Sequence, residues 1–395
     1  MLLGRFYDQV ELHREDKIVF ARFLSPHAVI STSRIGGGLR DDVSVLFNHQ
    51  SCEPAGHGGG HGHGLLHKAH HDPEGYMEDV CREHGIAVKE SAQLSTAANM
   101  RLIEIREFSF REISVAAAVT GGVEGNAGRA GDPATGYEGR NGWEPVSPGE
   151  ADEGPGTINT MIFINRPLTR GALVRSVMTA TEAKTAALEE LNVNSRYSDG
   201  RATGTGTDQI GVAALKDPDF PPLTNAGKHC KLGELIARAV KEATKAVLAR
   251  QNGMNPERQC SVKILLERFF KKGEKHFGIK GTDLAELFAA ELEDPDMKET
   301  LRLNRLALFY DPLNAAAVMS MVHLKDQFSW GVLPPLLFPE VMSLQAAVLA
   351  AAVSGKPHRV EEYRKLLGEI PADSSNRAFT KLVARAFALG FEEKW

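Results

Sequence analysis

Short apolar runs alternate with longer segments of helical spacing over roughly the first 250 residues of the chain. The clearest run is 158–164, which Gly156 precedes and Pro167 follows, and this pattern is typical of a buried strand. Apolar positions three and four residues apart predict two long helices instead, over 172–191 and 231–249. Further strands are predicted over 17–24, 28–33, 94–100, 102–120 and 210–215. Strands that alternate with helices indicate an α/β fold, in which helices flank a mixed β-sheet core.

The second half of the chain has a different pattern. Glycine becomes rare after Gly253, and Asn255 and Pro256 mark the clearest boundary in the sequence. Helical periodicity then dominates, as in 264–270, 284–293, 297–309 and 379–391. We therefore predict two domains, an α/β domain over 1–253 and an all-helical domain over 254–395. The second carries no chemical motif, so it is either a helical cap on the first or a module for interaction or dimerisation.

Composition narrows the classes of protein that fit. Hydrophobic residues make up 42% of the 395 positions and charged residues 25%, as in a soluble globular protein. The net charge of −5 argues against a nucleic-acid partner. The four cysteines are widely spaced, the N-terminus lacks an apolar signal segment, and the apolar stretch 344–353 is too short to span a bilayer. We expect a cytoplasmic protein without a membrane partner.

Two segments read as insertions or loops. The stretch 57–71 holds six histidines among glycines, in a spacing that matches no catalytic zinc motif. It is either a dispensable loop that binds metals adventitiously or a segment with a role linked to cobalt. The glycine-rich stretch 121–156 reads as a long loop, of which 133–155 is a candidate lid.

The most specific chemical pattern is the run ATGTGTDQI at 202–210. Two glycines alternate with Thr203, Thr205 and Thr207, and Asp208 follows. Glycines let the backbone approach a partner closely, and hydroxyls beside a carboxylate suit an acyl-transfer site or an oxyanion cradle. The run is not a phosphate-binding loop, because the spacing GxxxxGK[ST] is missing. A plain polar turn before the strand at 210–215 is the simpler alternative.

Charged residues elsewhere offer partners for this bend. His229 lies just before the helix at 231–249, where the helix dipole favours a neutral imidazole that suits a general base. Glu182 and Lys184 interrupt the apolar pattern of the helix at 172–191, although two solvent-exposed charges are an equally good explanation. Asn159 and Thr160 lie within a buried strand, so they either close a hydrogen-bond network or face a ligand.

Several runs together resemble the adenosylcobinamide amidohydrolase family. They are GTINT at 156–160, ALVRSVMTATEAKTAALEELNVNSRYS at 172–198, ATGTGTDQI at 202–210 and KLGELIARAVKEA at 231–243. Upstream, IGGGL at 35–39, FNHQ at 47–50, LSTAANM at 94–100 and VTGGVEGNAGRAGD at 119–132 also look like that family. The likeness spans about residues 15–250, in order. It implies hydrolysis of the amide that joins aminopropanol to the corrin ring of adenosylcobinamide, in corrinoid salvage and cobalamin (vitamin B12) biosynthesis.

Two mechanisms fit such an amidohydrolase. Either Thr205 or Thr207 attacks the carbonyl, or Asp208, His229 and Glu182 activate a water molecule, with or without a divalent metal. Lys184 or Arg175 is expected to polarise the amide oxygen. The resemblance also suggests substrate contacts at Asn48, Thr157 and Asn159.

The expected partner is a small corrinoid substrate. No cofactor is firmly indicated, the metal ligands are unknown, and a homo-oligomer is an open alternative to a monomer. A corrinoid- or cobalt-binding carrier without catalysis is the competing functional class, because the histidine-rich segment suits metal binding.

Overall fold

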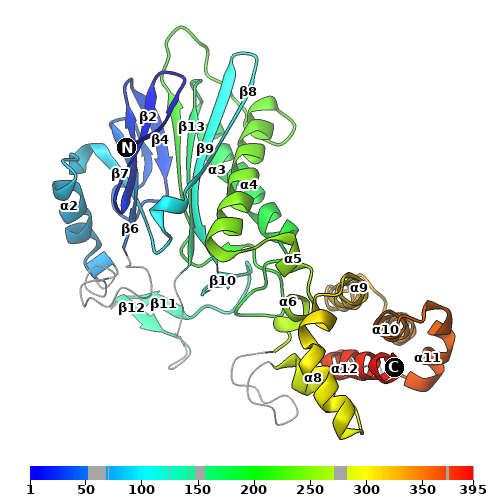
Figure 1. Cartoon of the computed structure of the whole chain (residues 1–395). Helices are drawn as coiled ribbons and strands as arrows, with labels where there is room; N and C mark the ends of the chain where they lie inside the picture. The colour runs from blue at the N-terminus through cyan, green and yellow to red at the C-terminus, as the bar shows by residue number, and fades with distance from the viewer. Residues whose placement is uncertain are drawn as a thin grey trace. The chain divides into compact units, whose positions relative to one another are not determined.

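The computed structural model describes residues 1–51, 68–69, 71–123, 125–140, 142–146, 156–270, 283–370 and 373–394. Most of the histidine-rich segment and much of the predicted lid lie outside these residues. The chain divides into two compact units, Met1–Met254 and Asn255–Trp395. Figure 1 shows a β-rich first unit and a helical second unit.

The first unit contains two sheets. One has the strand order β1 (Leu2–Phe6), β2 (Val10–Glu15), β3 (Ile18–Phe23), β6 (Val45–Gln50) and β7 (Ser91–Thr96). The other has the order β5 (Gly38–Arg40), β4 (His27–Ser31), β15 (Gln209–Leu215), β13 (Thr157–Ile164), β9 (Ile113–Gly122) and β8 (Glu104–Phe110). The pairs β6–β7 and β13–β15 are parallel, and the other neighbouring strands are antiparallel. Both sheets are therefore mixed.

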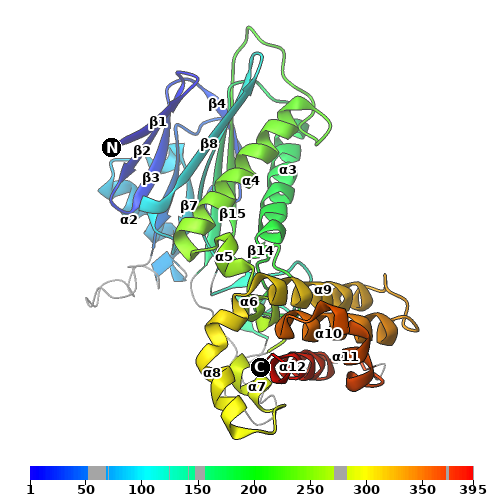
Figure 2. The ribbon, with the colours of Figure 1, turned by 45° about the vertical axis from the view of Figure 1, so that its right-hand side comes forward.

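Apolar cores at three levels, one of them made of two clusters, separate this unit into four layers. Leu12, Leu46 and Phe163 belong to the core between the two sheets. On the other face of the second sheet, α3 (Arg170–Glu190) and α4 (Lys231–Asn252) pack side by side, as Figure 2 shows. On the outer face of the first sheet, α2 (Pro73–Glu83) covers a third core. The strand β13 is buried on both faces, which explains why its second half, 161–164, is a continuous apolar run.

Local sequence explains where the long helices begin and end. The Thr169 side chain accepts a hydrogen bond from the Ala172 amide and so caps the start of α3. Helix α4 ends at Gly253, whose φ of 62° is the left-handed conformation that glycine adopts without strain. Shorter elements complete the unit: η1 (Val88–Glu90), η2 (Met100–Leu102), and the ribbons β10 (Ala127–Gly128) with β14 (Gly204–Thr205) and β11 (Gly136–Gly139) with β12 (Gly142–Pro145).

The second unit is helical and has its own core. Its helices are α5 (Pro256–Gln259), α6 (Val262–Glu267), α7 (Leu284–Ala289), α8 (Pro295–Phe309), α9 (Pro312–Ser329), α10 (Phe338–Ser354), η3 (Pro357–Arg359), α11 (Val360–Leu367) and α12 (Asn376–Glu392). The buried rings of Phe288, Phe309 and Phe387 pack on one another in its centre. The predicted fold class, a mixed-sheet α/β core with a helical C-terminal region, is confirmed.

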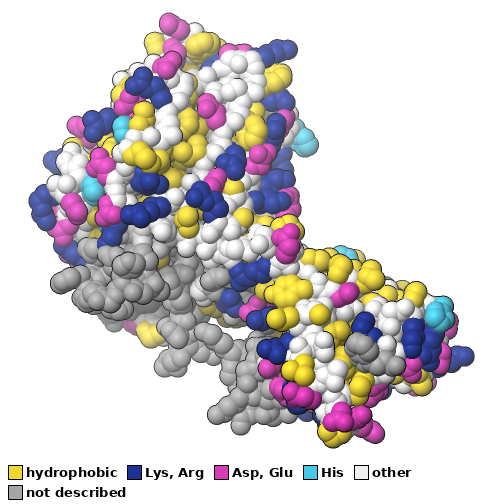
Figure 3. All heavy atoms as spheres, viewed as in Figure 1, with side chains coloured by type: hydrophobic (Ala, Val, Ile, Leu, Met, Phe, Trp, Pro, Cys, Tyr) yellow, Lys and Arg dark blue, Asp and Glu magenta, His cyan; other side chains and the backbone are white. Residues whose placement is uncertain are grey.

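Charges of both signs are mixed on the surface of the first unit: Figure 3 shows Lys and Arg interspersed with Asp and Glu over its visible face. Across the described ranges, no helix is both long enough and apolar enough to cross a membrane.

Two buried histidines, His27 and His49, couple the first unit to pH, because burial lowers the pKa of each to about 4, and His27 is the more completely buried. His27 on β4 is fully buried, its Nδ1 lies 2.7 Å from the Ser25 carbonyl oxygen, and its Nε2 lies 3.1 Å from the Tyr7 hydroxyl. Its ring also stacks on Phe23, with 4.5 Å between the ring centroids. Burial lowers the pKa of His27 from 6.5 to about 4, because desolvation disfavours the imidazolium. The fold therefore accommodates the neutral ring only.

Acid is predicted to destabilise the first unit through this residue. The unfolded chain takes up a proton on His27 below about pH 6.5 while the folded chain does not, so stability falls as the pH drops toward 4. Between pH 7.5 and pH 5 the loss amounts to about 2 kcal/mol. Urea unfolding at the two pH values measures it, and His27→Gln should reduce the pH dependence by that amount. An unchanged pH dependence in the variant would contradict the assignment.

Candidate functional site

The polar ends of several strands meet at one end of the two sheets. In the second sheet, Asn159 on β13 lies opposite Gln209 on β15, and Thr157 lies opposite Gly122 on β9. The first sheet reaches the same place, because the Ser95 amide on β7 donates a hydrogen bond of 2.8 Å to Gln209 Oε1. Segments far apart in sequence are thus neighbours here: 47–50, 94–100, 119–132, 156–160 and 202–210.

The Asp208 carboxylate is the centre of this end. Its Oδ1 accepts hydrogen bonds from the Ile158 amide at 2.8 Å and from the Thr205 hydroxyl at 2.6 Å. Its Oδ2 accepts from the Thr205 amide at 2.9 Å and forms an ion pair with Lys184. A carboxylate offers about four lone-pair positions, so these four donors fill all of them. Asp208 therefore joins the start of β13, the bend at 203–208 (the threonine bend) and α3.

Lys184 brings α3 to the bend. Its side chain is 14% exposed and donates to Asp208, and the hydroxyl of its neighbour Thr185 donates to the Thr203 carbonyl at 3.1 Å. Gly204 leaves the space that the ion pair fills. A Cβ atom at that position would lie 2.5 Å from Asp208 Oδ2 and 2.8 Å from Lys184 Nζ. The glycine is therefore required by close packing against the ion pair.

A second hydroxyl group lies beside the ion pair. Thr207 Oγ1 is 2.7 Å from Thr157 Oγ1 and donates to the Gly156 carbonyl at 2.8 Å. The Asn126 amide nitrogen donates to the same Thr207 oxygen at 3.4 Å. Thr207 is exposed, whereas Asn126 and Thr157 are buried. The Thr207 hydroxyl is thus held by buried neighbours, on a residue that is exposed as a whole.

Buried amides lie beneath the bend. Asn48 and Asn159 are each 1% exposed, and Asn159 Nδ2 donates to Asn48 Oδ1 at 2.8 Å. Asn48 Nδ2 donates to Thr120, and Asn159 Oδ1 accepts from the Gln209 amide. Sequence left a network and a ligand contact as alternatives, and the structure shows a network. These two asparagines connect the sheets below the site, and the substrate contacts expected of them stay a prediction.

Three other predicted residues lie away from Asp208. Glu182 is exposed and forms a 2.5 Å ion pair with Lys228, and His229 is exposed on the turn before α4. Arg175 is exposed on α3, nine residues before Lys184 and therefore about 14 Å along the helix axis. Over the described part of the chain, no hydrogen bond or ion pair connects these three to Asp208. The predicted contact between Asp208 and His229 is not formed.

Two further loops, at 125–132 and 192–203, also pack beside the bend. Sequence reasoning did not connect them with it. The ribbon of β10 with β14 pairs Ala127 with Thr205, and the Ala130 amide donates to Thr203 at 2.8 Å. Asp132 accepts from the Ser195 hydroxyl at 2.6 Å. Sequence gave one indication of this, because both loops belong to runs that resemble the family.

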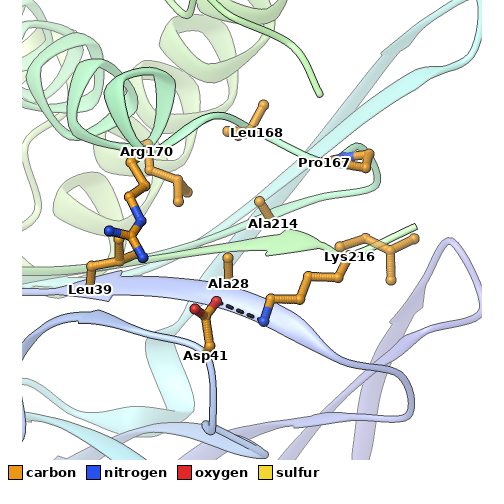
Figure 4. Close-up of a pocket in the computed structure, with 10 residues that line it drawn as sticks. Ala28, Leu39, Asp41, Pro167, Leu168, Arg170, Ala214 and Lys216 are labelled. Atoms are coloured by element: carbon orange, nitrogen blue, oxygen red, sulfur yellow. Dashed lines mark ion pairs between the residues drawn. The ribbon is translucent and has the colours of Figure 1, made fainter. Parts of the chain in front are cut away.

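Within the described residues, no cluster of three or more His, Cys, Asp or Glu side chains is placed to hold a metal ion. Figure 4 shows a hollow of about 200 Å³ at the far end of β15, where Asp41 forms a 2.7 Å ion pair with Lys216. The seven residues of β15 separate it from Asp208 by about 20 Å, so it is distinct from the polar end.

Comparison with known proteins identifies the family. The fold and the site define a class of protein: a layered α/β unit with a polar centre at one end of its sheets. Residues 4–256 match the family model described as adenosylcobinamide amidohydrolase, and the chain belongs to this family. It is 36% identical over 244 residues to the uncharacterized protein MJ1613 of Methanocaldococcus jannaschii, an alignment that covers 60% of this chain and 88% of that protein.

A solved structure also matches, at a much lower level. The PH0078 protein from Pyrococcus horikoshii OT3 aligns with a TM-score of 0.28 and 14% identity, over 59% of this chain and 78% of that one. A likeness at this score carries no argument about fold or function.

Two glycines of the bend provide a matched test of its packing. Gly204→Ala should lower the free energy of unfolding by about 1–3 kcal/mol, because the new methyl group displaces the Lys184–Asp208 pair. Gly206→Ala is the control, since a Cβ atom there meets nothing within 4 Å. Both changes remove a similar amount of chain entropy from the unfolded state, so their difference reports the clash. Equal stabilities by urea unfolding would contradict the packing described.

Proposed function

We propose that this protein hydrolyses the amide that joins aminopropanol to the corrin side chain of adenosylcobinamide, giving adenosylcobyric acid and 1-aminopropan-2-ol. Family membership over residues 4–256 supports the general activity. One observation carries the proposal further. Five family-like runs, spread from residue 47 to residue 210, gather their polar side chains around the Asp208–Lys184 pair and the Thr207 hydroxyl. This end of the sheets is the site that we propose.

The groups at this end suit amide hydrolysis. The reaction needs a donor for the carbonyl oxygen, where negative charge develops, and an oxygen nucleophile for the carbonyl carbon. Lys184 supplies a cation, and Thr207 supplies a hydroxyl held by Thr157 and Asn126. In the proposed step, Thr207 Oγ1 bonds to the carbonyl carbon, the C–N bond breaks, and the hydroxyl proton passes to the amine, which leaves as aminopropanol. A water molecule then cleaves the resulting ester: its oxygen and one proton end on the new carboxyl group, and its other proton returns to Thr207.

The site also matches the chemistry of the proposed ligand. The bend carries threonine hydroxyls and one ion pair, in which the charges of Lys184 and Asp208 balance each other. A corrin ring presents many neutral side-chain amides, which recognise hydroxyls by hydrogen bonds rather than by charge. We include Thr205 among the contacts, because its half-exposed side chain is fixed by Asp208.

Incubation of the purified chain with adenosylcobinamide tests the function. The expected result is release of 1-aminopropan-2-ol and adenosylcobyric acid in equal amounts. The amine is measured by derivatisation and mass spectrometry. Parallel reactions with and without a chelator determine whether a metal takes part. Binding of the corrinoid without any release of amine would exclude the amidohydrolase and favour a carrier.

Substitution of Thr207 tests the location of the site. Thr207→Val removes the hydroxyl at nearly constant volume and should lower kcat by roughly 100-fold or more. Thr207→Ser keeps the hydroxyl and its bonds to Thr157 and Gly156, so it should stay within about tenfold of the original chain. Equal activity of the valine and serine variants would place the reaction elsewhere in the molecule.

A further inference from the structure

Sequence reasoning assigned Asp208 as part of the acid–base machinery, and its surroundings argue against that role. All four lone-pair positions of its carboxylate are occupied, by two backbone amides, one hydroxyl and one ammonium group. Taking a proton from water would require the loss of at least one of these charge-assisted hydrogen bonds. A carboxylate with all of its acceptor positions filled holds its neighbours in place.

Lys184 is in the opposite condition. An ammonium group has three donors, and within the part of the chain that the structure describes Lys184 uses them for one partner, Asp208. The side chain is 14% exposed, so its remaining donors lie in a largely desolvated place at the edge of the bend. In such a place a donor acts more strongly on a developing negative charge than it does in water.

The packing fixes where those donors lie. Gly204 has no side chain to screen the ion pair, and a Cβ atom there would fall 2.8 Å from Lys184 Nζ. The Thr185 hydroxyl holds the same turn of α3 on the Thr203 carbonyl. The Lys184 ammonium is therefore held beside the Thr205–Thr207 bend, whereas Arg175 lies about 14 Å back along the helix.

We propose that Lys184 is the group that binds and polarises the carbonyl oxygen of the substrate amide, and that Asp208 is a positioning residue that acts through Lys184. The Lys184 ammonium group donates hydrogen bonds that strengthen as charge develops on the oxygen. Asp208 holds the ammonium and the bend in one arrangement. This inference rests on the proposed function.

A double-mutant cycle on the full chain separates this account from one in which Asp208 is an independent base. Lys184→Met should lower kcat by roughly 100-fold or more, as the loss of one oxyanion donor does in other enzymes. Asp208→Asn should lower it by roughly tenfold to 100-fold. If Asp208 acts through Lys184, the double variant should be within about threefold of Lys184→Met alone. Losses that multiply would overturn the positioning role.

A second measurement does not depend on how well the methionine variant folds. Alkylation of Lys184→Cys with 2-bromoethylamine restores an ammonium group at the same position. It should raise kcat at least tenfold above that of the same variant before alkylation. The original chain treated in the same way controls for alkylation of its own cysteines. Lys245→Met is the matched surface control, because Lys245 pairs with Glu190 on the outside of α3 and α4.

The outcomes separate this inference from the proposed function. No release of aminopropanol by the original chain would overturn both. Normal release by the original chain together with near-normal release by Lys184→Met would overturn the role of Lys184 alone. Failure of the alkylated cysteine variant to recover activity while it binds substrate would also overturn that role.

Discussion

The site depends on the carboxylate of Asp208, which is largely buried and accepts a hydrogen bond at each of its lone-pair positions. A carboxylate that is 13% exposed has lost most of its water and must recover those hydrogen bonds within the protein. Asp208 recovers them from the start of β13, from the threonine bend and from α3. Three elements distant in sequence are thereby fixed at one point. The glycine at position 204 follows from the same requirement, because any side chain there would occupy the space of the ion pair.

The two mixed sheets bring these elements together. Parallel pairing of β13 with β15 places the residues before both strands at the same end, and antiparallel β9 returns there with Thr120 and Gly122. The chain of buried polar side chains from Thr120 through Asn48 to Asn159 connects the sheets beneath the bend. Each of these groups would be costly if left unpaired, so the network specifies the relative position of the two sheets at the site.

Much of the fold could be predicted from local pattern. The apolar run at 161–164 in β13 and the helical spacing of α3 and α4 identify those elements directly, because burial on two faces or along one stripe determines them. The bend was recognisable from its alternating glycines and threonines. Lys184 was one of several candidate partners, but sequence could not single it out at 24 residues from Asp208, and Ile158, 50 residues away, was not among them.

Two differences between sequence reasoning and the structure have the same physical origin. His229 was chosen for its chemistry and its position before a helix, and the structure places it on an exposed turn with no hydrogen bond to Asp208 among the described residues. Asn48 was expected to contact the substrate because its run resembles the family, and the structure pairs its side chain with the buried amide of Asn159. Residue type and spacing do not indicate which face of a strand or which end of a helix meets the site.

The most direct measurement is a crystal structure of the chain with its corrinoid substrate or product bound. The account predicts that one side-chain carbonyl or carboxyl oxygen of the corrin lies within hydrogen-bond distance of Lys184 Nζ, with Asp208 still bound to Ile158 and Thr205. A corrinoid bound at the hollow beside Asp41 and Lys216, or with its amide on His229, would contradict it.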